Sequence, residues 1–227
     1  MIVAALPPHA GQPVVATGAP LDRARGAVIM VHGRNAEPRN ILDLVPALAR
    51  PDLAYLAPAA SGRTWYPQSF LAPRNQNEPG ISSGLSVLGA LVTQLAAASI
   101  PQERVVLLGF SQGGCLSSQF AVEHAGRYGG LILFSGGLIG APGTTWDFPG
   151  SFDGTPVFLG CSDVDSHVPA ARVRESAAVF ERMGARVDMR LYPGMGHLVN
   201  EEEVKAAREI LGGIAGAGRD EVTRRGR

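Results

Sequence analysis

The sequence predicts one α/β domain with a mostly parallel central sheet, helices on both faces of the sheet and no large cap domain. Its 227 residues lie within the range of one such domain, and 45% of them are apolar, which is enough for a sizeable core. Short continuous apolar runs alternate with helical patterns, and such runs are typical of parallel strands buried on both faces. No repeat, linker or change of composition divides the chain. We therefore expect residues 1–227 to form one domain, with about 213–227 as a flexible C-terminal tail.

The first half of the chain predicts two strands and two helices. "AVIMVHG" at 27–33 is a short apolar run that ends in glycine, as a buried strand would. The helical spacing at 41–50 is interrupted by Pro46, which must lie early in that helix or kink it. The run at 53–58 is typical of a second strand, and apolar residues at helical intervals predict a long helix over 80–99.

The second half continues this alternation. Pro169 suits the first turn of a helix, Gly184 its end, and Asn200 the N-cap of a last helix. The expected elements are a strand at 104–110, a helix at 112–126, strands at 130–136 and 155–161, a helix at 169–184, a strand at 185–194 and a helix at 200–214.

Two connections are much longer than the 2–6 residues usual in α/β domains: about 57–80 and 136–155. Both follow strands, so both leave the sheet at its carboxyl edge. Open α/β sheets bind ligands at that edge. We therefore expect the functional site there.

Composition excludes several classes of function. The formal net charge is zero and the pI is about 7, so no basic surface indicates nucleic acid or an anionic membrane. Lys205 is the only lysine and no Walker motif is present. Cys115 and Cys161 lack metal-ligand spacing and read as buried thiols, so we expect no metal and no cofactor. The apolar N-terminus lacks a basic region, and no apolar run approaches a membrane span, so a cytoplasmic protein without stable membrane insertion is expected.

The segment "GFSQGG" places Ser111 between a predicted strand and a predicted helix. Gly109 and Gly113 lie two residues on either side of it, where the two backbones come too close for a Cβ atom. This arrangement is typical of a nucleophile elbow, which exposes a serine hydroxyl above the sheet. The helix that follows directs its N-terminus at the reacting centre, so the N–H of Gln112 can donate to an oxyanion.

A serine needs a base, and His197 is the candidate. It lies in the glycine-rich "YPGMGHLVN" loop, also at the carboxyl edge and able to reach the elbow. His9 and His124 are expected at the protein surface. His32 ends a strand and is expected to make structural hydrogen bonds.

The orienting carboxylate should follow another strand, between Ser111 and His197 in the chain. "GCSDVDSHVP" offers Asp163 and Asp165, and their position alone does not separate them. The second oxyanion donor is expected in the loop after the first predicted strand, where Gly33 allows close approach and the N–H of Arg34 is the candidate.

These motifs together resemble those of the phospholipase/carboxylesterase family of α/β-hydrolases, which includes acyl-protein thioesterases. The resemblance runs over about residues 27–212 and includes "HG", "TWY", "GFSQGG", "DSHVP" and "GMGH" in that order. It implies the α/β-hydrolase fold, a nucleophile at Ser111, a base at His197 and oxyanion donors at Arg34 and Gln112. The family aspartate precedes "xxVP", so the resemblance assigns that role to Asp165 rather than Asp163. It also implies a homodimer as one oligomeric state.

Two motifs depart from those of the thioesterases. "HGRNAEP" and "WYPQSF" stand where the thioesterases usually have "LGD" after "HG" and "WFD" or "WYD". These loops shape the entrance of the site, so activity on acylated proteins is not implied. The two long loops and the base loop supply apolar side chains for a pocket, and we expect Trp65, Phe70, Leu71, Leu138 and Met195 to contact the substrate.

The predicted activity is that of a serine carboxylesterase acting on small or medium-chain esters. One alternative is a dienelactone-hydrolase-like or carbon–carbon bond hydrolase on the same fold, although the former usually has cysteine at the elbow. Another is a receptor with the hydrolase fold that binds a ligand without turnover. A purely structural protein would require the elbow, the base loop and the carboxylate loop all to be accidental.

Overall fold

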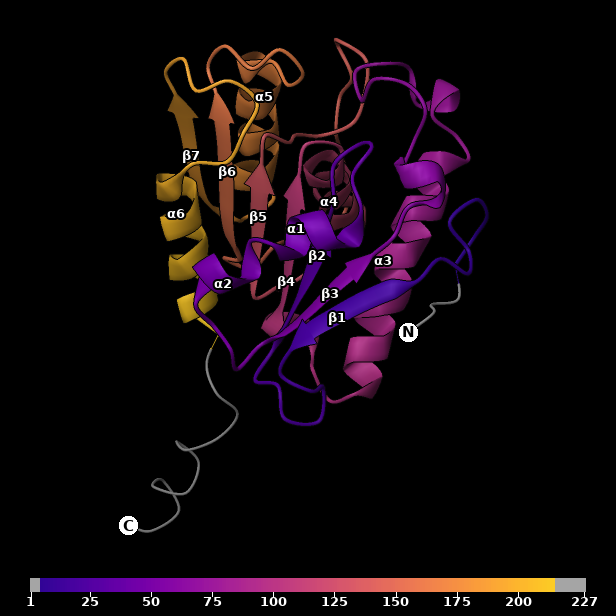
Figure 1. Ribbon diagram of the computed structural model, residues 1–227. Coiled ribbons are helices and arrows are strands. Elements are labelled where there is room, and N and C mark those ends of the chain that lie inside the picture. Colours follow the sequence, from indigo (N-terminus) through magenta and orange to yellow (C-terminus); the bar gives the residue numbers. More distant parts are fainter. Residues whose placement is uncertain (1–4, 215–227) are drawn as a thin grey trace.

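The computed structural model describes residues 5–214, and the tail expected at about 213–227 lies from residue 215 onward outside the described residues. Seven strands form one sheet, with α3, α4 and α5 packed on one face and α1, α2 and α6 on the other (Figure 1). The order is β1-β3-β2-β4-β5-β6-β7, and only β1 is antiparallel to its neighbour. The predicted α/β fold with a mostly parallel sheet is confirmed.

The strands are β1 (Val14–Gly18), β2 (Ala27–Val31), β3 (Ala54–Pro58), β4 (Val105–Phe110), β5 (Gly130–Phe134), β6 (Pro156–Ser162) and β7 (Arg186–Tyr192). The α-helices are α1 (Pro38–Leu42), α2 (Val45–Leu48), α3 (Gly80–Ala97), α4 (Gln112–Glu123), α5 (Ala170–Arg182) and α6 (Glu201–Gly212). Strands β2 to β5 are buried along nearly their whole length because helices cover both faces, which explains their continuous apolar runs.

Two features differ from the sequence-based expectation. Strand β1 was not predicted, because "VVATG" is short and most of its side chains are partly or fully exposed at the edge of the sheet. The helix expected at 41–50 is divided into α1 and α2. Pro46 lies in the first turn of α2, where its missing N–H leaves no hydrogen bond unmade.

Helix α3 is long and apolar enough, by length and composition, to cross a membrane, and half of its residues are buried within the fold. It packs against α4 and β2, which accounts for its apolar composition.

The loops that follow β3 and β5 leave the sheet at its carboxyl edge, as do the elbow after β4 and the loops after β6 and β7. In Figure 1 this edge lies at the top, where the arrowheads of β5, β6 and β7 point. All the predicted site residues come from this edge or the loops above it.

Candidate active site

Ser111 lies at the turn between β4 and α4 with φ 56° and ψ −120°, a conformation that non-glycine residues rarely adopt. A Cβ on Gly109 would lie 2.6 Å from the Gly114 nitrogen, and a Cβ on Gly113 2.6 Å from the His32 carbonyl oxygen. The backbones of β4, α4 and the end of β2 therefore meet without room for side chains. Ser111 N–H donates to the Phe134 carbonyl at 2.9 Å, which ties the turn to β5.

The structure brings Ser111, His197 and Asp165 into one hydrogen-bonded chain. His197 Nε2 lies 2.9 Å from Ser111 Oγ, and His197 Nδ1 lies 2.7 Å from Asp165 Oδ2. In the tautomer protonated at Nδ1, the ring donates to the carboxylate and accepts from the serine hydroxyl. These are the contacts that a general base needs.

The surroundings of Asp165 favour its ionised form, although its side chain is fully buried. Burial opposes ionisation, but the hydrogen bond from His197 and the N–H groups of His167 and Val168 outweigh it and hold the pKa of Asp165 below its usual value. The two N–H groups donate to Oδ1 at 2.8 and 3.0 Å, leaving Oδ2 for His197. A fixed carboxylate of this kind can orient an imidazole and stabilise its charged form.

Asp163, the other aspartate of the same loop, does not contact His197. Its Oδ1 accepts the N–H of Gly194 at 2.8 Å, and Ser162 Oγ accepts the N–H of Gly196 at 3.0 Å. The two side chains thus hold the base loop from the end of β6.

Arg34 and Gln112, the residues expected to supply the oxyanion donors, lie at the same cavity as Ser111. Both residues line it, and Gln112 is the first residue of α4, where helical N–H groups have no intrahelical acceptor. The cavity has a volume of about 490 Å³. Its wall consists of Gly33, Arg34, Asn35, Ala36, Tyr66, Pro67, Gln68, Ser69, Phe70, Phe110, Ser111, Gln112, Cys115, His167, Val168 and His197.

Of the five side chains expected to contact the substrate, only Phe70 belongs to this wall. Trp65 is completely buried; its Nε1 donates to the His32 carbonyl, and its ring packs between His9 and His32. Trp65 thus packs inside the fold rather than lining the cavity.

The other three expected contacts also lie away from the cavity wall. Leu138 is buried in the core cluster and Leu71 packs against that cluster, whereas Met195 Sδ accepts a hydrogen bond from Asn200 in the base loop. Their positions were inferred from chain proximity to the site, and chain proximity does not determine which way a side chain points.

Two other histidines, His32 and His9, make structural hydrogen bonds away from Ser111. His32 makes structural hydrogen bonds, with Nδ1 2.8 Å from the Gly33 oxygen and Nε2 accepting from Ala60 N–H, as expected. The surface position expected for His9 is wrong: it is buried, and both ring nitrogens bond to the backbone, to Trp65 and Ser61. The backbone N–H groups of Leu6 and His9 donate to Ser86 and Ser83 of α3. These contacts join residues far apart in the chain, so no local sequence pattern predicts them.

His167 also lines the cavity, although it was not among the predicted site residues. Its ring packs edge-on against that of His197, with the ring centroids 4.6 Å apart. Its position two residues after Asp165 is the sequence feature that could have identified it as a residue near the site. It adds a polar, exposed side chain at the mouth of the cavity.

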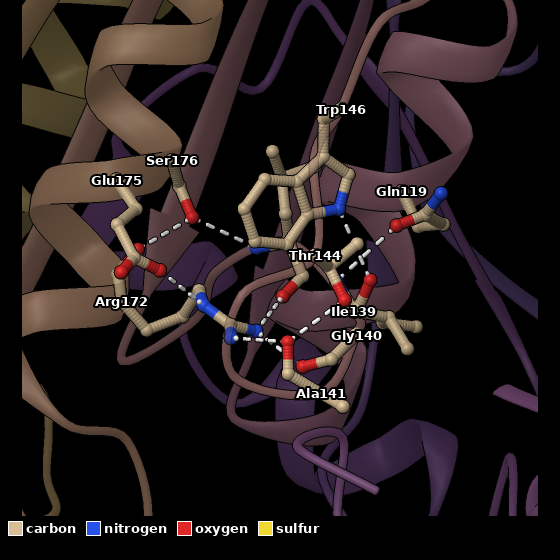
Figure 2. Close-up of polar contacts among 10 residues, drawn as sticks. Gln119, Ile139, Gly140, Ala141, Thr144, Trp146, Arg172, Glu175 and Ser176 are labelled. Carbon is tan, nitrogen blue, oxygen red and sulfur yellow. Dashed lines mark hydrogen bonds and ion pairs between the residues drawn. The ribbon is translucent and has the colours of Figure 1, made fainter. Parts of the chain in front are cut away.

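A buried guanidinium holds the long loop between β5 and β6 (Figure 2). Arg172, on α5, is 3% exposed and donates to the carbonyls of Leu138 and Gly140 at 2.8 Å and to Glu175 at 2.8 Å. The N–H of Gly140 donates in turn to the Phe70 carbonyl. The cavity wall that contains Phe70 is therefore anchored from α5 through this loop.

Both cysteines are buried, and burial raises the pKa of each to about 12, so neither is a thiolate at neutral pH. Among residues 5–214, no three or more His, Cys, Asp or Glu side chains are grouped to hold a metal ion. A second cavity of about 420 Å³ lies at the amino ends of β6 and β7, away from Ser111.

Known proteins resemble the chain both in sequence and in structure. The sequence model of a family described as Phospholipase/Carboxylesterase matches residues 12–213. The crystal structure of a phospholipase/carboxylesterase from Dyadobacter fermentans DSM 18053 superposes with a TM-score of 0.87 and 38% identity, covering 91% of this chain and 99% of that one. That of a Bacillus cereus carboxylesterase has a TM-score of 0.71 and 17% identity, covering 90% and 95%, which shows the fold alone.

Curated relatives match over a shorter range. Acyl-protein thioesterase 1 of Gibberella zeae is 32% identical over 141 residues, which are 61% of this chain and 60% of that protein. A probable carboxylesterase of Oryza sativa subsp. japonica is 26% identical over 57% of this chain and 48% of its own length. The matched part therefore spans less than two thirds of the length of these relatives.

Proposed function

The chain belongs to the phospholipase/carboxylesterase family, and from that membership we propose that it is a serine carboxylesterase of small or medium-chain carboxylic esters. The observation that carries the proposal is the hydrogen-bonded chain from Ser111 through His197 to Asp165, at 2.9 and 2.7 Å, beside a cavity of about 490 Å³. A cytoplasmic location and a homodimer stay predictions.

The proposed reaction is acyl transfer to water in two steps. His197 takes the Ser111 proton while Oγ attacks the ester carbonyl, and the N–H groups of Arg34 and Gln112 stabilise the oxyanion. His197 then gives its proton to the leaving alcohol, which departs and leaves an acyl-enzyme. Water, deprotonated by His197, attacks this ester; collapse of the second oxyanion returns the proton to Ser111 and releases the acid.

The cavity wall supports an acyl group of limited size. Phe70, Phe110 and Val168 supply apolar surface, and the volume lies toward the lower end of the range usual for small-molecule sites. We infer that the ester rate peaks at a short or medium chain length.

The two segments whose motifs differ from those of the thioesterases contact each other. The Arg34 guanidinium donates to the carbonyls of Pro67 and Gln68 at 2.8 and 2.5 Å, so "HGRNAEP" and "WYPQSF" form one joined rim. A rim fixed in this way differs from that of the thioesterases at the entrance, where an acylated protein would have to dock. This supports a small ester rather than an acyl-protein substrate.

The test is hydrolysis of p-nitrophenyl esters over a series of chain lengths, with wild type and Ser111→Ala side by side, together with fluorophosphonate labelling read by intact mass. We expect turnover of short or medium esters and one label on the wild type, and neither on Ser111→Ala. A folded wild type that neither labels nor hydrolyses these esters would overturn the proposal. Turnover of cyclic lactones in preference to linear esters would favour the dienelactone-hydrolase-like alternative.

A further inference from the structure

One residue that lines the cavity has a buried polar atom without a hydrogen-bond partner. Within residues 5–214, six buried side-chain oxygens lack any partner: Tyr66 OH, Gln94 Oε1, Ser117 Oγ, Ser135 Oγ, Tyr192 OH and Glu203 Oε1. Of these residues, only Tyr66 lines the cavity that contains Ser111. A buried donor without a partner is costly, and one at a ligand cavity has an obvious candidate partner in the ligand.

Neighbouring protein groups do not satisfy this hydroxyl. The nearest polar side chain is the Cys115 thiol, and a thiol is a weak hydrogen-bond partner. The Arg34 guanidinium lies over the face of the Tyr66 ring, 5.9 Å from its centroid, rather than at the oxygen. The backbone of Tyr66 is fixed because its carbonyl accepts the Gln112 amide at 2.8 Å.

The hydroxyl lies beside Cys115, whose place relative to Ser111 is fixed by helix α4. Its neighbour Cys115 lies one turn of α4 below the nucleophile, with Cys115 N–H donating to the Ser111 carbonyl at 2.9 Å. One helical turn spans about 5.4 Å, which is the reach of a short acyl group extending from the ester carbonyl.

We propose that Tyr66 is a specificity-determining residue whose hydroxyl donates to a neutral oxygen in the acyl group, such as an ether, ketone or hydroxyl oxygen a few bonds from the ester carbonyl. This rests on the proposed carboxylesterase function. Burial raises the pKa of Tyr66 well above its usual value, so the hydroxyl stays protonated and able to donate.

A neutral acceptor fits better than a carboxylate because both nearby guanidinium groups are engaged. Arg34 bonds to Pro67 and Gln68, and Arg172 bonds to Leu138, Gly140 and Glu175. Both groups thus already direct N–H groups at protein oxygens, and an anionic acyl group beside Cys115 would lie close to the buried Asp165 carboxylate.

The experiment compares two matched esters on two variants. The p-nitrophenyl esters of pentanoic and 3-methoxypropionic acid differ only by the exchange of one CH₂ for oxygen. The ratio of their kcat/KM values is measured for wild type and for Tyr66→Phe, and dividing one ratio by the other cancels the intrinsic reactivities of the esters. We expect Tyr66→Phe to lower the relative preference for the ether ester about tenfold, which corresponds to about 1.4 kcal/mol.

Tyr128→Phe is the matched control. Tyr128 is also buried, but its hydroxyl donates to the His124 carbonyl at 2.9 Å, away from the cavity. This variant should lose stability and keep the wild-type ratio, whereas Tyr66→Phe should not be less stable than wild type, since no hydrogen bond is lost. A second pair, the p-nitrophenyl esters of butyric and methoxyacetic acid, is tested in the same way. Its ether oxygen lies one bond nearer the ester carbonyl, so the two pairs together test two positions of the acceptor.

The two proposals fail in different ways. If wild type takes the fluorophosphonate label and hydrolyses both esters, but the double ratio is within twofold of one for both pairs, the role of Tyr66 is overturned and the esterase function stands. A wild type without label or turnover overturns both.

Discussion

The elbow that carries Ser111 and the loop that carries His197 hold the two residues of the proposed proton transfer in different ways. In the elbow, Gly109 and Gly113 lie in backbone contact with neighbouring elements, and an added Cβ has no room. In the base loop, residues 193–200, an added Cβ on Gly194 or Gly196 would meet nothing within 4 Å. That loop is held instead by hydrogen bonds to Asp163 and Ser162.

The comparison shows that one region is determined by packing and the other by a few polar contacts. Packing between backbones leaves little freedom, so the elbow is expected to remain fixed under most conditions. Hydrogen bonds at a partly exposed loop contribute about 1 kcal/mol each, so the base loop is expected to be the more easily displaced end.

The largest expected effect separates the two aspartates at the base loop. Asp165→Asn removes the carboxylate that accepts from His197 Nδ1, and under the proposed mechanism we expect kcat/KM on a p-nitrophenyl ester to fall about 10⁴-fold. Asp163→Asn keeps an oxygen that can accept the Gly194 N–H, and we expect a loss of less than about tenfold. Steady-state kinetics on both variants measure the difference.

Fluorophosphonate labelling rates give the control for this pair, because labelling reports the reactivity of Ser111 independently of ester binding. Labelling should slow severely in Asp165→Asn and little in Asp163→Asn. A reversed order of the two variants in either measurement would contradict the assignment of Asp165 to His197.

The next effect compares one glycine from each region. In Gly113→Ala the new Cβ lies against the Val31 and His32 carbonyl groups, and we expect a loss of stability of about 3 kcal/mol or more. In Gly196→Ala the Cβ has open space and only the φ of 80° is strained, which costs about 1 kcal/mol. Urea denaturation followed by circular dichroism measures both.

Activity distinguishes the two glycine variants further. In the folded fraction of Gly113→Ala, we expect Ser111 to be displaced and ester hydrolysis to be lost. Gly196→Ala should fold, and its main defect should be a lower kcat on the same ester. Equal losses of stability in the two variants would show that the elbow is not held by backbone packing.

The same contrast explains what the sequence could and could not predict. Gly109, Ser111 and Gly113 form a local pattern whose structural requirement is local, and the buried strands have continuous apolar runs. Fold and elbow geometry were therefore predictable. The choice of Asp165 over Asp163 came from a family resemblance, because both residues are at a similar position in the chain.

Which side chains of the long loops line the cavity was not predictable in the same way. Leu138 and Phe70 belong to long loops whose paths depend on distant groups, above all the guanidinium of Arg172. The inward burial of Trp65 depends on His9 and His32, which are far from it in the chain. Side-chain direction in such loops follows from tertiary contacts, which have no periodic signature in the sequence.

The smallest expected effect is a pH dependence of stability caused by Glu203, a carboxyl group that bonds to the end of the base loop. Asn200, at the end of that loop, and Glu203 cap α6 reciprocally, at 2.8 and 2.9 Å, and Glu203 is fully buried with Oε1 unpaired. Burial raises the pKa of Glu203 to about 7. The elbow is held by backbone groups, which do not titrate, so only the base loop should have this sensitivity.

The sign follows from proton linkage. Between about pH 4.5 and 7 the folded state keeps a proton on Glu203 that the unfolded chain releases, so stability should fall as the pH rises through this window. Glu203→Gln keeps an acceptor for Asn200 N–H and removes the ionisation, so at pH 8 it should exceed wild type in stability by up to roughly 2–3 kcal/mol. Urea unfolding from pH 5 to 8 measures the trend, with Glu202→Gln, an exposed neighbour in the same turn, as control. If Glu203→Gln follows the wild-type curve across this range, the buried carboxyl does not titrate on folding, and the base loop is supported as independently of pH as the elbow.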